Sequence, residues 1–148
     1  MIVPDVNLLI YAYDELAPLH NSARQWWEET LSDSAAVGIP SIVLLAFVRL
    51  STHPAIVQTP ITIEQAEKIV ISWLAVDRVR ILSPSNDTFT LLFALLKNAG
   101  TGGNLTTDGL IAALATEFGG IVYSTDRDFD RFPDVVWRNP LSSRSLLK

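Results

Sequence analysis

The chain has 148 residues, of which 49% are hydrophobic, and its formal net charge at pH 7 is −5. This length and apolar content suit a single folded domain over residues 1–148 with a full core, and they exclude a disordered chain. The absence of cysteine excludes a disulfide framework and a thiolate zinc site, and it is compatible with the cytoplasmic location that we expect.

The first half of the chain alternates short apolar runs with helical patterns. We predict strands at residues 2–4 and 36–39, and helices at residues 7–13, 18–31, 41–50 and 62–75. The last of these helices opens with a capping box, in which Gln65 stands three residues after Thr62. The helix at 41–50 is apolar nearly all round, which predicts burial on most sides. Trp26 and Trp27 point about 100° apart on a helix, so we expect one in the core and the other available to a neighbour.

The second half continues the alternation. We predict strands at residues 79–82, 121–124 and 135–137, a helix at residues 87–98, and a further helix that Thr106 or Thr107 caps and that ends at Gly119. Strands that alternate with helices in this way predict a three-layer α/β/α sandwich with a mostly parallel central sheet.

The N-terminus lacks a basic region followed by a long apolar stretch, so no signal peptide is expected. No apolar run approaches the roughly 20 residues that a membrane-spanning helix needs. The acidic net charge is unusual for a protein that binds nucleic acid, because such proteins usually carry a basic footprint. Two interpretations stay open: nucleic acid is bound through a local basic rim and metal ions, or the substrate is small.

Three aspartates indicate a site. Asp5 and Asp126 each follow a predicted strand, and Asp108 opens a predicted helix. Side chains at the carboxyl ends of parallel strands converge on one crevice. Carboxylates gathered there repel one another unless a cation lies between them, and hard oxygen ligands suit Mg²⁺ or Mn²⁺. The pattern predicts a metal-dependent enzyme that acts on phosphates, with Asp128 as a possible fourth ligand.

Each of these residues also has an ordinary structural interpretation. Asp5 can be a helix N-cap, Asp108 can complement a helix dipole, and Asp126 can be a turn residue. Their shared position at one edge of the sheet favours the metal site. Neighbouring polar residues are candidates for orienting the aspartates, with helix-start and turn roles as the alternative. These residues are Asn7, Thr107, Ser124 and Thr125.

The segment DVNLLIYA at residues 5–12 resembles the opening motif of PIN-domain ribonucleases. The segment NLTTDGLIAALA at residues 104–115 is similar to the later aspartate-bearing helix of that family, and STDRDF at residues 124–129 resembles its final acidic motif. The order, the spacing and the total length together resemble the VapC-type toxins of bacterial toxin–antitoxin pairs.

The resemblance implies a metal-dependent endoribonuclease in which Asp5, Asp108 and Asp126 position Mg²⁺ or Mn²⁺ for hydrolysis of RNA. It also implies a structured RNA substrate such as tRNA. The resemblance further implies a homodimer. It also implies a partner protein, a small antitoxin that blocks the acidic pocket with a basic side chain.

One position departs from the family pattern. The family usually places a glutamate in the helix after the second strand, in a Leu-Ala-Glu context, and here Phe47 follows Leu45 and Ala46. This departure implies weak or substrate-dependent metal binding, and it leaves open a PIN-like binding protein without activity. A second alternative is a small-molecule phosphatase of the haloacid type. That class usually carries another aspartate two residues after the first, where this chain has Asn7.

Overall fold

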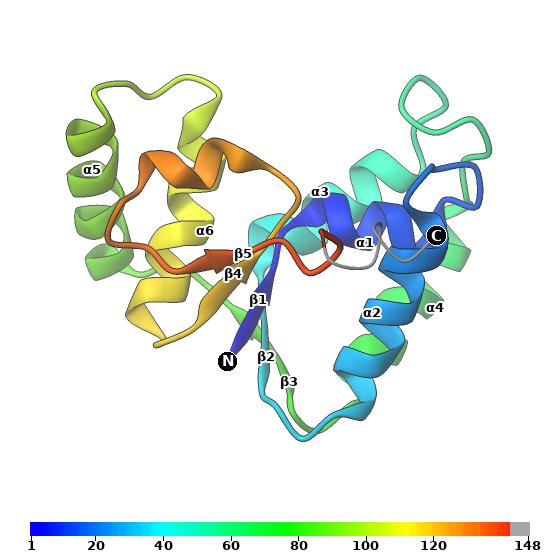
Figure 1. Ribbon diagram of the computed structural model, residues 1–148. Helices are drawn as coiled ribbons and strands as arrows, with labels where there is room; N and C mark the ends of the chain where they lie inside the picture. Colours follow the sequence, from blue (N-terminus) through cyan, green and yellow to red (C-terminus); the bar gives the residue numbers. More distant parts are fainter. Residues whose placement is uncertain (143–148) are drawn as a thin grey trace.

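A sheet of parallel strands in the order β3-β2-β1-β4-β5 forms the centre of the molecule (Figure 1). The computed structural model describes residues 1–142, and residues 143–148 of the predicted domain lie outside the described residues. The strands are β1 (Ile2–Pro4), β2 (Val37–Pro40), β3 (Val79–Leu82), β4 (Ile121–Tyr123) and β5 (Trp137–Arg138). The helices are α1 (Val6–Tyr13), α2 (His20–Ser32), α3 (Ser41–Ser51), α4 (Ile63–Leu74), α5 (Asn86–Ala99) and α6 (Leu105–Glu117), with a 3₁₀ helix η1 (Arg127–Arg131).

Two helical layers cover the sheet. Helices α1 to α4 link β1, β2 and β3 in turn and lie on one side, whereas α5 and α6 run from β3 to β4 and lie on the other (Figure 1). All the strand pairs found in the described residues are parallel. A right-handed crossover places the helices on opposite faces when the direction of strand addition reverses. The predicted three-layer α/β/α sandwich is confirmed.

The strand order reverses between β1 and β4. From β1 the chain builds outward through β2 to β3, and it then returns to place β4 on the free side of β1, where Pro4 pairs with Tyr123. In open α/β sheets, ligands bind in the crevice outside the carboxyl ends of the strands at such a reversal. The topology therefore predicts a ligand-binding site at the residues that follow β1 and β4.

No helix in the part of the chain that the structure describes is long and apolar enough to cross a membrane.

Two helices begin at least two residues away from the predicted start, whereas the other starts agree to within one residue. Helix α2 starts at His20, and Pro18 lies in the turn before it. Helix α6 starts at Leu105, before both predicted capping threonines. The carbonyl groups of Gly102 and Gly103 accept hydrogen bonds from the first backbone N–H groups of α6, so a threonine cap is not needed. Thr106 and Thr107 consequently lie within the first turn.

The prediction that only one of the adjacent tryptophans is buried is wrong. Trp26 is 7% exposed and stacks on Tyr123, and Trp27 is 2% exposed and meets Trp73 edge to face. Both indoles are covered because α2 packs against the sheet with one of its faces and against α4 with another. The predicted fifth strand at 135–137 begins later, at Trp137, because the N–H group of Val135 bonds the carbonyl of Phe132 instead.

Helix α3 is less buried than its composition predicts. Val43, Leu44 and Phe47 belong to the core, but Leu45 is 71% exposed. The helix therefore presents an apolar side chain to solvent on the face away from the core.

Candidate active site

Asp5 is the residue that joins β1 to α1 at the strand reversal. Its N–H group donates to the Tyr123 carbonyl of β4 at 2.9 Å, which holds it beside the neighbouring strand. Its Oδ1 accepts a hydrogen bond from the Val6 N–H at 2.7 Å, so Asp5 does cap the helix. The side chain is only 5% exposed, and this burial raises the pKa of its carboxyl group.

The hydroxyl group of Ser124 links three polar groups at this point. It donates to Asp5 Oδ2 at 2.7 Å, and it accepts from Asn7 Nδ2 at 3.1 Å and from the Asp126 N–H at 2.9 Å. Ser124 is 0% exposed. One buried hydroxyl therefore fixes Asp5, which follows β1, relative to Asp126, which follows β4.

A cluster of carboxylates lies next to this network. Asp108, Asp126 and Asp128 each offer one carboxylate oxygen, and these oxygens lie within 4.8 Å of one another. The Asp128 N–H donates to Asp126 Oδ1 at 2.8 Å, which ties the two acidic residues at the start of η1 together. Gly109 lets the first turn of α6 approach α5, because a Cβ atom there would lie 2.9 Å from Leu92 Cδ1. This close packing sets the position of Asp108.

The electrostatics of the cluster favour a bound cation. Burial and the charges of Asp5, Asp126 and Asp128 raise the pKa of Asp108 to about 7. The ion pairs of residues 1–142 join Arg24 to Glu28 and Arg127 to Asp130, so none of them neutralises Asp108. Carboxylate oxygens alone are a hard ligand set, which matches Mg²⁺ or Mn²⁺. The residues present fit a divalent cation of that kind.

The remaining residues predicted for the site occupy different places. Asn7 lies beside Ser124, and its Oδ1 is buried without a hydrogen-bond partner in residues 1–142. Thr125 is half-buried after β4. Thr107 is exposed on the first turn of α6 and lines a hollow with residues of α3.

Phe47 does not line the hollow that α3 shares with α6. It is 0% exposed and packs against Tyr13, at a centroid distance of 5.8 Å, and Trp73, at 4.8 Å. Tyr13 ends α1, about 12 Å along the helix from Asp5 at 1.5 Å per residue. The face of α3 toward α6 instead carries four other residues, which sequence reasoning missed. These are Ile42, Leu45, Ala46 and Arg49. Their i, i+3, i+4, i+7 spacing places them on one face of the helix, but the apolar residues around them hid which face this is.

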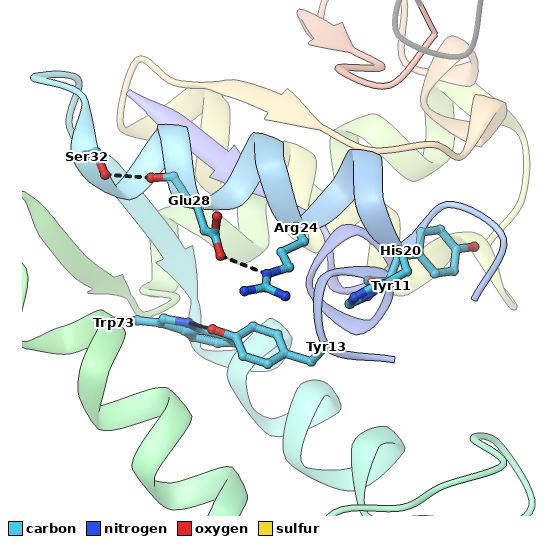
Figure 2. Close-up of polar contacts among 7 residues, drawn as sticks. All are labelled: Tyr11, Tyr13, His20, Arg24, Glu28, Ser32 and Trp73. Carbon is cyan, nitrogen blue, oxygen red and sulfur yellow. Dashed lines mark hydrogen bonds and ion pairs between the residues drawn. The ribbon is translucent and has the colours of Figure 1, made fainter. Parts of the chain in front are cut away.

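A separate hollow of about 200 Å³ lies at the far end of α1. Figure 2 shows Tyr13 accepting a hydrogen bond from Trp73 Nε1, and Arg24 paired with Glu28 along α2. The first of these contacts measures 2.9 Å. His20 faces back to α1, with Nδ1 2.8 Å from the Tyr11 carbonyl oxygen. None of the clustered aspartates lines this hollow. The acidic site is therefore at the opposite end of α1.

Ser124→Ala is expected to weaken the site through its supporting network. The change removes the hydrogen bond that Ser124 makes to Asp5 Oδ2, to Asn7 Nδ2 and to the Asp126 N–H, which costs about 1–3 kcal/mol of the free energy of unfolding. Loss of such a supporting bond also lowers divalent-cation affinity about 10–100-fold. Denaturant unfolding and Mn²⁺ titration measure the two effects.

Ser51→Ala is the matched control, because Ser51 is also buried but its Oγ has no partner in residues 1–142. This change should alter unfolding by less than about 1 kcal/mol and leave cation affinity unchanged. Equal effects of the two substitutions would contradict the role assigned to Ser124.

Comparison with known proteins agrees with this geometry. Residues 2–135 match the family model described as "PIN domain". The chain is 34% identical over 141 residues to Ribonuclease VapC33 of Mycobacterium tuberculosis, covering 95% of this chain and 99% of that protein. It is 36% identical to Ribonuclease VapC37 of the same organism, covering 95% and 97%.

Solved structures share the fold. The structure of VapC20 from Mycobacterium tuberculosis, titled a sarcin-ricin loop cleaving toxin, superposes with a TM-score of 0.69 at 18% identity, covering 92% of this chain and 97% of that one. VapBC2 from Rickettsia felis, bound to a DNA fragment from its promoter, gives 0.67 at 21% identity, covering 94% and 98%. The chain belongs to the PIN-domain family and, within it, to the VapC-type ribonuclease toxins of toxin–antitoxin pairs.

Proposed function

We propose that the chain hydrolyses phosphodiester bonds of a structured RNA, such as tRNA, at a site formed by Asp5, Asp108 and Asp126. Asp108, Asp126 and Asp128 would hold Mg²⁺ or Mn²⁺ directly, and Asp5 would border the ion from β1. The observation that carries the proposal is the convergence of carboxylates on Asp108. Their charge, next to the reversal of the strand order, is not compensated by any ion pair of residues 1–142.

Such a cation, when bound, lowers the pKa of a water molecule and polarises the scissile phosphate. The protein residues orient the reactants. Ser124 holds Asp5 and Asp126 in a fixed relation. Asn7 Oδ1, which has no hydrogen-bond partner among residues 1–142, can accept a hydrogen bond from water beside them. No cysteine is present and Ser124 is fully buried, so water is the nucleophile that this site favours.

We further propose a homodimer and a small antitoxin as protein partners. Several relatives are described as complexes, among them VapBC2 of Rickettsia felis and a toxin–antitoxin complex from Klebsiella pneumoniae. An acidic pocket on a chain of net charge −5 suits an antitoxin that inserts a basic side chain. Sedimentation of the purified toxin alone measures whether it dimerises.

Total RNA incubated with antitoxin-free protein tests the activity. We expect discrete fragments with Mg²⁺ or Mn²⁺, no cleavage with a chelator, and no cleavage by Asp5→Asn. The alternative is a PIN-like binding protein, and it would be supported if folded wild-type protein cleaved nothing under any of these metals. Cleavage that persists in chelator would show that the acid cluster is not a metal centre.

A further inference from the structure

Helix α3 and the first turn of α6 line an open hollow of about 370 Å³. Its walls are Ile42, Leu45, Ala46 and Arg49 of α3 and Thr107 of α6. Thr107 directly precedes Asp108, so the hollow borders a residue of the acid cluster. The volume lies within the range of about 300–1,000 Å³ that small-ligand pockets occupy.

The hollow supplies the positive charge that RNA binding needs. RNA phosphates and the clustered aspartates repel each other, and the net charge of −5 adds to this repulsion. Arg127 stands between two of the aspartates, but its guanidinium group pairs with Asp130 at 3.3 Å. Arg49 is exposed and takes part in neither ion pair of residues 1–142. Its guanidinium group is free to form a two-pronged contact with a phosphate.

The other walls suit the rest of a nucleotide. Leu45 is 71% exposed, and together with half-buried Ile42 it gives the hollow an apolar side beside the cationic one. A ribose and base have apolar faces that can cover such side chains, whereas the phosphate needs the arginine. We propose that this hollow, the α3 subsite, binds a nucleotide adjoining the scissile bond, with Arg49 holding its phosphate. The inference rests on the proposed ribonuclease activity and extends it by locating the path of the RNA.

Kinetics of the full-length toxin on an RNA that it cleaves test the α3 subsite. Arg49→Gln should raise KM about tenfold and lower kcat much less, because a lost charge-assisted contact weakens binding. The dependence of log(kcat/KM) on log salt should become shallower by about 0.7–1. Arg49→Lys should give a KM between those of the wild type and Arg49→Gln, since lysine keeps the positive charge but lacks the two-pronged geometry of the guanidinium group. Lys68→Gln removes the same charge from the exposed face of α4 and should change neither quantity.

Three results would overturn the inference. The first is a KM and salt slope of Arg49→Gln equal to those of Lys68→Gln in a wild-type background that cleaves RNA, which leaves the proposed function intact. The second is a shift of the sedimentation mass in Arg49→Gln, which would assign the hollow to contact between copies of the chain. The third is the absence of any RNA cleavage by the wild type, which removes the proposed function and the inference together.

Discussion

Asp108→Asn is expected to reduce metal-dependent RNA cleavage by at least about 10³-fold, because a bound cation contributes several kcal/mol and each 1.36 kcal/mol is tenfold in rate. The substituted side chain keeps its size but loses the negative charge on which the cluster converges. The variant should nevertheless be at least as stable as the wild type without metal, since like-charge repulsion is removed. Rates and thermal unfolding of the same preparations measure both effects.

The pH dependence of the metal-free protein follows from the same residue. The folded-state pKa of Asp108 is about 7, above its unfolded value, so the folded protein holds a proton that the unfolded chain releases. The contribution of Asp108 to stability is therefore fully present below the unfolded pKa near 4 and is lost as pH rises through about 7. Thermal unfolding in chelator should show this decline in the wild type and a smaller one in Asp108→Asn, in which the raised pKa of Asp5 still contributes. A flat profile in the wild type would contradict the raised pKa.

Phe47→Glu is expected to destabilise the fold by at least about 4 kcal/mol, although the change puts the family's usual residue at that position. Removal of a buried phenylalanine alone costs about 3–5 kcal/mol, and an unpaired carboxylate among aromatic rings adds a further penalty. Phe47 is 0% exposed between Tyr13 and Trp73. The variant should not bind Mn²⁺ more tightly. Denaturant unfolding and Mn²⁺ titration measure the outcome.

Ala46→Glu is the matched control, because it adds the same side chain one residue earlier on the half-exposed face of α3. We expect a cost of about 1 kcal/mol or less, as for most surface changes. If Phe47→Glu instead folded with wild-type stability and bound Mn²⁺ more tightly, position 47 would face the cation. The placement of Phe47 in the core, away from the acid cluster, would then be wrong.

The layers of this fold can be predicted well from the sequence, because the spacing of the apolar residues and the positions of the helix-capping residues indicate the same helices and strands. The capping box at Thr62 is present as predicted, and the alternation of strands and helices gives the parallel sheet. The start of α6 could not be predicted, because glycine carbonyl groups in the preceding loop take the place of a side-chain cap. Local preference for threonine at a cap is outweighed there by the loop conformation.

The candidate site was only partly predictable for a related reason. Aspartates that follow strands can be found by inspection, but the bond between Ser124 and Asp5 joins residues 119 positions apart and depends on the pairing of β1 with β4. The orientation of α3 is likewise a tertiary property. An almost wholly apolar helix does not disclose which side chain faces the core, so neither the burial of Phe47 nor the exposure of Arg49 could be read from it.

Titration of the metal-free protein with Mn²⁺ tests most directly whether the aspartate cluster is the metal centre. Electron paramagnetic resonance measures the free Mn²⁺ at each step. We expect saturable Mn²⁺ uptake by the wild type at pH 8, competed by Mg²⁺ and lost in Asp108→Asn and Asp126→Asn. Saturable uptake that survives in both variants, or no uptake by folded wild-type protein in the presence of RNA, would contradict this expectation.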